Sequence, residues 1–294
     1  MLLNCLEKYL VCPVCDSFLK LTDNTLKCSH SHSFDVAREG YVNLLPVTHR
    51  RSSHPGDSKE MLISRKQFLD RGHYLQLSDL INELVENYLR EEIICQTDAT
   101  RIVLDAGSGT GYYLSKISDH IAKYSTDKCV CYVGVDISKT ACRIASKSDP
   151  GSCYIVANIF RKLPLVEHSV DVLLTVFAPW NKVEFERLLK VGGLLIMVTP
   201  GARHLEELRA LANIASEIGQ TAELRKQELS HEFDYVNSVA IESMLDLRQP
   251  DITNLFRMTP YYWQTSMETR TTIEHIPQLI VSVDFRISIY RLIS

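Results

Sequence analysis

The stretch RIVLDAGSGTGYYLSKI, residues 101–117, constrains the fold more than any other part of the chain. Its apolar beginning, 102–104, predicts a short buried strand, and the residues from Tyr112 onward predict a helix. Between them lies G-S-G-T-G at 107–111. Glycine has no Cβ, so the backbone of such a loop can pass close to a ligand at the start of a helix. The sequence therefore predicts a strand–loop–helix unit with a ligand on the glycine loop.

The spacing of the glycines indicates the kind of ligand. A dinucleotide site has the pattern G-x-G-x-x-G, whereas this loop has G-x-G-x-G with Asp105 two positions before the first glycine. The form D-x-G-x-G-x-G resembles motif I of the class I S-adenosylmethionine-dependent methyltransferases. An acidic residue at this end of the loop suits the α-ammonium group of S-adenosylmethionine. A nicotinamide site and a purely structural turn are the alternatives.

Further strand ends follow along the chain. CVCYVGVDIS predicts a second strand ending at Asp136, whose carboxylate can accept hydrogen bonds from both ribose hydroxyls. A third strand ends near Asn158, a fourth precedes FAPW at 177–180, and a Gly-Gly turn at 192–193 precedes a fifth. Alternating strands and helices predict an α/β fold with a doubly wound, mostly parallel sheet that binds ligands at the carboxyl ends of its strands.

A cluster of cysteines and histidines lies at 12–32, near the beginning of the chain. Three thiolates and one imidazole form the tetrahedral ligand set of structural zinc, here Cys12, Cys15, Cys28 and His32. His30 is a rival for the fourth position, and SFLKLTDNTLK between the ligands predicts a β-hairpin. A redox pair of cysteines and thiols without a metal are the alternatives. A segment of about 25 residues buries too little apolar surface to fold by itself, which favours a bound zinc ion. Four protein ligands leave no open position, so this zinc would be structural.

The charge is distributed unevenly along the chain, which has a net charge of -4 over 294 residues. Residues 1–75 carry ten Lys/Arg against eight Asp/Glu, so contact with nucleic acid is expected there. We expect a zinc-binding RNA-recognition domain at 1–45, a basic linker and the start of a connecting helix at 46–75, and a Rossmann-like methyltransferase domain at 76–294. The candidates for contact with the RNA backbone are Arg38, Arg50, Arg51, Lys59 and Arg65.

The remaining cysteines show no disulfide-framework spacing, and the sequence shows neither a signal peptide nor a membrane-spanning stretch. Free thiols are typical of a reducing compartment, so a cytoplasmic protein is expected. The cysteines expected to be free are Cys5, Cys95, Cys129, Cys131, Cys142 and Cys153.

Almost the whole chain resembles one family, the bacterial 23S rRNA (guanine-N1)-methyltransferases of the RlmA type. The resemblance rests on CPVC, HSFDVAREGYVNLLPV, PGDS, GHY, DAGSGTGYY, FAP, TPGARHL and MTPYYW, in that order along the chain. The A-R-E-G-Y-V-N-L-L-P run is far more specific than any glycine pattern. Ser108 and Thr110 are a departure, since family members often carry Cys and Glu there; backbone contacts should survive this change.

The resemblance implies several properties. It places zinc ligands at the four residues named above, and cofactor contacts at Tyr74, at Thr110-Gly111 and at His204. It further implies methylation of guanine N1 in hairpin 35 of 23S rRNA, and a homodimer with zinc modules flanking an RNA cleft. One branch of the family is tied to macrolide resistance. The full set of expected S-adenosylmethionine contacts is Tyr74, Asp105, Gly107, Gly109, Thr110, Gly111, Asp136, Ile137, Asn158 and His204.

The segment FAPW at 177–180 bears on the methylated atom. It lacks the Asn/Asp-Pro-Pro-Tyr of exocyclic amine methylation and the Pro-Cys of cytosine C5 chemistry, which favours a ring nitrogen or oxygen. Phe177, Pro179 and Trp180 could stack on a flipped base or simply close the sheet edge. No side chain identifies itself as the proton acceptor. A class I methyltransferase acting on a small molecule or another RNA, and a non-catalytic RNA-binding protein, are the alternatives.

Overall fold

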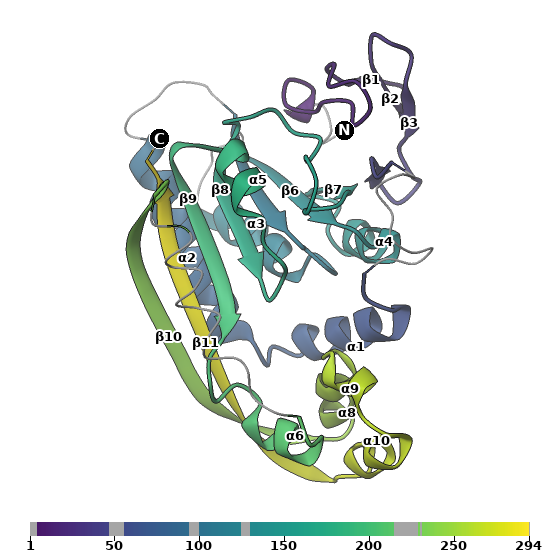
Figure 1. The fold of residues 1–294 in the computed structure, drawn as a ribbon, viewed down its shortest axis with the longest axis vertical. Helices are drawn as coiled ribbons and strands as arrows, with labels where there is room; N and C mark the ends of the chain where they lie inside the picture. Colours follow the sequence, from purple (N-terminus) through teal and green to yellow (C-terminus); the bar gives the residue numbers. More distant parts are fainter. Residues whose placement is uncertain are drawn as a thin grey trace.

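The computed structural model describes residues 5–46, 56–93, 100–124, 130–214, 229 and 231–293. At its centre is an eight-stranded sheet (Figure 1). Six adjacent strands run parallel, and β11 pairs antiparallel with both of its neighbours. In spatial order the strands are β10 (Phe233–Arg248), β11 (Gln278–Leu292), β9 (Leu189–Pro200), β8 (Val170–Val176), β5 (Arg101–Ala106), β6 (Val130–Asp136), β7 (Cys153–Val156) and β4 (Val42–Asn43).

Both faces of the central parallel strands are buried, whereas most residues of the edge strand β10 are exposed. Successive residues of β5 belong to different apolar clusters: Val103 packs in one, and Ile102 and Leu104 pack in the other. This arrangement explains why the strand has a continuous apolar sequence instead of an alternating one. Three helices connect consecutive parallel strands, namely α3 (Tyr112–Tyr124), α4 (Lys139–Ser148) and α5 (Lys182–Leu188). The predicted doubly wound fold is confirmed.

Two helices lie between β4 and β5 in the chain. α1 (Lys59–Asp70) begins after Ser58, whose hydroxyl accepts a hydrogen bond from the Met61 N–H over 3.2 Å. Gly72, with φ +83°, separates it from α2 (Leu75–Ile93). One face of α2 is apolar and buried, as shown by the exposed fractions of Leu77, Ile81, Val85 and Leu89 (0–3%).

The N-terminal module is a small three-stranded antiparallel sheet of β1 (Lys20–Thr22), β2 (Thr25–Lys27) and β3 (Ser33–Asp35). The first two strands form the predicted hairpin, with Asp23 in the left-handed region at φ 54°. The Asp23-Asn24 pair suits this turn because short polar side chains tolerate the left-handed conformation.

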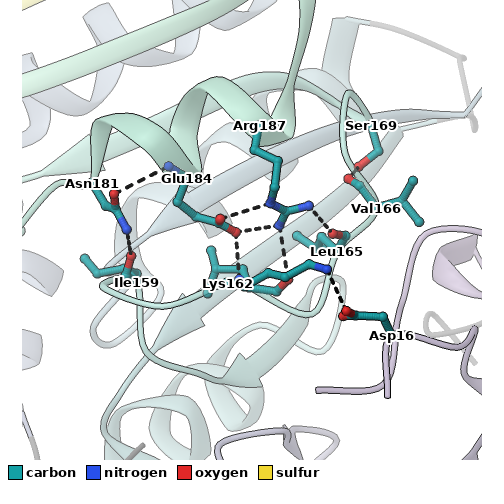
Figure 2. A network of polar contacts seen from close by, with 10 residues as sticks. Asp16, Ile159, Lys162, Leu165, Val166, Ser169, Asn181, Glu184 and Arg187 are labelled. Carbon is teal, nitrogen blue, oxygen red and sulfur yellow. Dashed lines mark hydrogen bonds and ion pairs between the residues drawn. The ribbon is translucent and has the colours of Figure 1, made fainter. Parts of the chain in front are cut away.

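The module is attached to the large domain through the loop that follows β7. The backbone of this loop bonds to the module through Val11 N to Pro164 O (3.1 Å) and Val166 N to Tyr9 O (2.9 Å). Lys162 forms an exposed ion pair with Asp16 over 2.9 Å (Figure 2).

The loop itself is fastened to α5, as Figure 2 also shows. The Glu184 carboxylate accepts a hydrogen bond from the Leu163 N–H over 2.7 Å, and Arg187 donates to the Leu165 carbonyl over 2.9 Å. Glu184 and Arg187 also pair with each other, so the buried carboxylate is neutralised. The module therefore lies on a loop that α5 holds in place.

The prediction that Cys5 and Cys131 are free thiols is wrong in this structure, because the two form a disulfide with their Cα atoms 6.5 Å apart. They are 126 residues apart in sequence, so no spacing rule could have paired them. Cys142 and Cys153 are free and buried, as expected. Cys95 and Cys129 lie outside the described residues.

The chain between β10 and β11 forms an insert of three short helices: α8 (Asp251–Arg257), α9 (Tyr261–Gln264) and α10 (Met267–Glu274). Figure 1 shows this insert beside α1, at the end of the molecule that also holds α6 (Glu206–Leu211). An ion pair between Arg71 and Asp251 (2.8 Å) joins the insert to the segment after α1. None of the described helices is both long enough and apolar enough to span a bilayer.

Candidate active site

The glycine loop joins β5 to α3, and its three glycines have positive φ angles of 88°, 53° and 78°. A Cβ at Gly107 would overlap the Cβ of Ala178, and one at Gly111 would lie 2.9 Å from the Ala145 Cβ and would also overlap Tyr154. Glycine is therefore required here for both conformation and space. The loop bends tightly across the carboxyl ends of the parallel strands.

Asp136 ends β6 and lies against this loop. Its carboxylate accepts hydrogen bonds from the Gly109 N–H over 2.9 Å and from the Ser138 N–H over 2.7 Å. Each carboxylate oxygen has more than one lone-pair position, so further donors can still be bound. Burial raises the pKa of Asp136, while the two backbone donors oppose this effect.

A cavity of about 670 Å³ opens at this edge of the sheet. Most of the residues expected to bind the cofactor line it, and Gly111, which faces Tyr154 and Ala145, does not. Those that line the cavity are Tyr74, Asp105, Gly107, Gly109, Thr110, Asp136, Ile137, Asn158 and His204. Of the expected base-pocket residues, Phe177 and Pro179 line the cavity, whereas Trp180 packs against the apolar core on the N-terminal module's side.

Several buried hydroxyl groups of the cavity have no hydrogen-bond partner among the residues that the structure describes. These are the side-chain oxygens of Tyr74, Ser108, Tyr112 and Tyr113. Buried polar atoms are normally paired. The unpaired hydroxyls, the Asp136 carboxylate and the loop residues that line the cavity therefore fit a polar ligand with hydroxyl, amino and carboxylate groups, as S-adenosylmethionine has.

The Asp105 carboxyl and the His204 imidazole, which both line the cavity, have strongly shifted pKa values. Burial, reinforced by the charge of Asp136, raises the pKa of Asp105 to about 8. Burial also lowers the pKa of His204 to about 4, so the imidazole is neutral at physiological pH. The Asp284 N–H donates to Nδ1 of His204 over 3.3 Å, so the proton of the neutral ring is on Nε2.

Aromatic rings form the wall near His204. Phe177, at φ 51° in the turn after β8, stacks on the imidazole with ring centroids 5.6 Å apart and 21° between the planes. Phe285 and Tyr74 pack behind them, 4.8 Å apart. Phe177 is 41% exposed, so one part of its ring is open to an incoming ligand.

Arg65 does not lie on an open surface, as an RNA-backbone contact would. It forms an ion pair with Asp57, donates to the Met258 carbonyl over 3.1 Å and lines the cavity. Sequence reasoning missed Asp57 and Arg65 as cavity residues because the connector carries no binding motif. Lys59 is exposed at the start of α1, and Arg50 and Arg51 lie outside the described residues.

The N-terminal cluster has the geometry of a metal site. The ligand atoms of Cys12, Cys15, Cys28 and His32 all lie within 4.8 Å of one another. The Cys15 and Cys28 sulfurs are 3.7 Å apart, and the Cys28 sulfur is 3.4 Å from Nδ1 of His32. A tetrahedron with Zn–S bonds of about 2.3 Å has sulfurs about 3.8 Å apart, so these residues fit a zinc ion. His30 points away from the cluster to Ser17, over 3.0 Å.

The comparisons with known proteins agree with both parts of this geometry. Residues 10–53 match the family model described as RlmA, N-terminal, and residues 104–197 match a methyltransferase domain. The 23S rRNA (guanine(748)-N(1))-methyltransferase of Streptomyces fradiae is 32% identical over 285 residues, which cover 95% of this chain and 96% of that protein. The chain belongs to the 23S rRNA (guanine-N1)-methyltransferase family.

Other relatives extend the comparison. A protein of Micromonospora griseorubida, provisionally named for the same activity, is 34% identical over 271 residues, covering 87% of this chain and 88% of that protein. Among solved structures, an S-adenosylmethionine-dependent methyltransferase from Thiobacillus denitrificans in complex with S-adenosyl-L-homocysteine is similar, with a TM-score of 0.40 and 17% identity over 70% of this chain and 91% of that one. The two family models and the strand order of the sheet show a class I methyltransferase fold with an N-terminal zinc ribbon, as predicted.

Proposed function

We propose that this protein transfers a methyl group from S-adenosylmethionine to N1 of a guanine in the hairpin 35 region of 23S rRNA. The observation that carries the proposal is the cavity on the glycine loop, with its Asp136 carboxylate, in a chain whose family relationship extends over nearly its full length. When bound, the cofactor supplies a methyl group on a sulfonium, which is transferred in a single in-line displacement. Catalysis of such a step is mostly positioning.

The residues around the loop are suited to hold this cofactor. Asp136 would accept hydrogen bonds from the ribose hydroxyls while Gly109 and Ser138 keep its carboxylate oriented. Asp105 would face the α-ammonium group, whose charge favours the ionised carboxylate. The unpaired Tyr74 hydroxyl would gain a partner. This assignment rests on the side chains that the cavity brings together.

The guanine would bind on the Phe177 side of the cavity. The partly exposed ring of Phe177 offers a face for stacking, and Pro179 lines the same wall. His204 is neutral and protonated on Nε2, so it would act as a hydrogen-bond donor, not as the acceptor of the N1 proton. A donor here would stabilise the guanine oxygen, which gains negative charge as the N1 proton passes to water and N1 takes the methyl group from the sulfonium.

The zinc ribbon supports a macromolecular substrate. Zn²⁺ held by Cys12, Cys15, Cys28 and His32 would stabilise the module without taking part in the reaction, because four protein ligands complete its coordination. We place RNA contacts on this module and the basic connector, with Arg38 and Lys59 among the described residues. We further propose a homodimer acting in the cytoplasm, where its ribosomal substrate is found.

The experiment that tests the proposal combines the purified protein, S-adenosylmethionine and an unmodified 23S rRNA transcript. The RNA is digested to nucleosides, which are identified by mass spectrometry. We expect 1-methylguanosine and no other methylated nucleoside. Methylation of another nucleoside, or of small-molecule acceptors in place of the RNA, would contradict the proposal.

A further inference from the structure

The insert between β10 and β11 carries an aromatic and arginine group that the cofactor cavity does not use. Tyr262 and Trp263 follow directly after Tyr261, which lines the cavity. Their rings meet edge to face with centroids 5.3 Å apart. Trp263 is 50% exposed, so the structure leaves half of a large apolar side chain in solvent.

Arg270 completes this group from α10. Its guanidinium carbon lies 4.4 Å from the ring centroid of Tyr262 and 5.7 Å from that of Trp263. Its Nε is buried and has no hydrogen-bond partner within the described part of the chain. In the part of the chain that the structure describes, the neighbouring Arg257 is paired with Glu274 over 2.7 Å, whereas Arg270 has no such ion pair. The charge of Arg270 is therefore available to an external anion.

The group is held on a rigid base. Ile252, Leu255 and Phe256 of α8 are completely buried, and Phe256 packs edge to face on Tyr262 with centroids 5.3 Å apart. The Thr265 hydroxyl donates to the Tyr261 carbonyl over 2.6 Å, which fixes the end of α9. An exposed aromatic ring on so well packed a support loses little conformational entropy when it binds a partner.

An exposed indole beside an unpaired guanidinium matches the chemistry of an unpaired nucleotide. Nucleobases stack on aromatic side chains whatever their sequence, and arginine binds phosphate as well as aromatic faces. The chain passes from the cavity at Met258–Tyr261 to this group without a break. A guanine inserted into the cavity would therefore leave its neighbouring nucleotide close to Tyr262 and Trp263.

We propose that Tyr262, Trp263 and Arg270 form an RNA-binding surface that stacks an unpaired nucleotide adjacent to the target guanine and contacts its phosphate. This inference rests on the proposed function. In this proposal the three-helix insert positions the RNA strand that contains the target guanine at the cavity. The zinc ribbon and its basic connector contact other parts of the RNA.

The test compares two replacements of Trp263 that keep its apolar character. Trp263→Phe retains a ring that can stack, and Trp263→Leu removes it. Binding of a hairpin 35 RNA fragment is measured by fluorescence anisotropy, and steady-state methylation gives KM for the same RNA. We expect affinity within about twofold of wild type for Phe and about tenfold weaker for Leu, with KM rising in parallel. Affinity for S-adenosylmethionine, measured by calorimetry, should be unchanged in both.

Arg270 is tested with a matched control on the same helix. Arg270→Gln should weaken RNA binding and reduce the slope of log K against log salt concentration by about one. Thr272→Ala, which changes an exposed side chain on the other side of α10, should behave as wild type.

The outcomes separate the two proposals. A wild-type protein that neither binds nor methylates the RNA overturns the proposed function itself. A wild-type protein that methylates the RNA, with Trp263→Leu and Arg270→Gln equal to it in RNA affinity and salt dependence, overturns this inference alone. A purely structural role would lower the melting temperature of both variants and leave the RNA affinity of the folded fraction unchanged, which also contradicts the inference.

Discussion

The backbone N–H of Gly109 donates a hydrogen bond to the side chain of Asp136 over 2.9 Å, which joins the glycine loop to the end of the next strand. We predict that Asp136→Asn lowers the affinity for S-adenosylmethionine about 10- to 100-fold. The amide replaces an accepting oxygen with a donor and removes the charge, and hydrogen bonds to charged groups are the stronger ones. Isothermal titration calorimetry measures the change. Asp119→Asn, at an exposed position of α3, is the control and should bind as wild type; equal affinity in both variants would exclude Asp136 from the site.

Because Gly111 is crowded and Gly72 is not, we predict that replacing each by alanine lowers the free energy of unfolding by different amounts. Gly111 and Gly72 have φ angles of +78° and +83°, but a Cβ at Gly72 meets nothing within 4 Å. Gly72→Ala should therefore cost about 1 kcal/mol of unfolding free energy from backbone strain alone. Gly111→Ala adds overlap with Tyr154 and Ala145, so we expect about 3 kcal/mol. Urea denaturation gives both values, and equal losses would show that the loop can move away from these side chains.

The raised pKa of Asp105 predicts that the stability of the folded protein depends on pH. Its carboxyl is buried, and its pKa in the folded protein is raised to about 8 from an ordinary value of 3.8. Between these values the unfolded chain has lost the proton and the folded protein retains it, so the free energy of unfolding falls as pH rises. From pH 5.5 to 8 this group contributes a loss of roughly 3 kcal/mol.

The isosteric Asp105→Asn variant removes this titration. We expect the cofactor-free variant to lose less stability than wild type over the same pH range, and to be the more stable of the two at pH 8. Urea denaturation at the two pH values measures the effect. Parallel pH profiles for the variant and wild type would show that Asp105 is already ionised in the fold.

We predict different zinc contents for alanine variants of His30 and His32 in the N-terminal module. His32 lies with the three cysteine sulfurs, and His30 faces Ser17. Purified wild type and His30→Ala should each contain one zinc per chain by mass spectrometry of the metal. His32→Ala should contain less than half, because a three-ligand site binds more weakly. Full zinc occupancy in His32→Ala together with its loss in His30→Ala would reverse the assignment.

Local patterns were enough to predict most of the site. The glycine loop, Asp136 and Asn158 each follow a strand in the sequence, and parallel topology brings such strand ends to one edge. The four candidate zinc ligands lie within 21 consecutive residues, so their spacing identified the three cysteines and left His30 and His32 as candidates for the fourth position. Tyr74 and His204 depended on the resemblance to the family, because a single tyrosine or histidine has no local signature.

Other features depend on contacts between distant parts of the chain. The Cys5–Cys131 disulfide and the hydrogen bond from Arg65 to the Met258 carbonyl arise from tertiary packing that no short pattern encodes. Trp180 is adjacent in sequence to cavity residues, yet it packs against the other apolar cluster. The long antiparallel pair β10 and β11 was also not predicted, because residues 234–238 of β10 are all exposed, which breaks the alternation typical of a strand, and a three-helix insert separates the two strands in sequence.

Methyl transfer to guanine N1 is tested most directly by primer extension on 23S rRNA, because a methyl group on N1 blocks base pairing and stops reverse transcription. The RNA would come from a strain lacking the gene, carrying a plasmid for either the wild-type protein or Asp136→Asn. The account predicts a single strong stop at one guanine of the hairpin 35 region with the wild-type protein, and a much weaker stop with the variant. The same pattern of stops with and without the wild-type protein would contradict it.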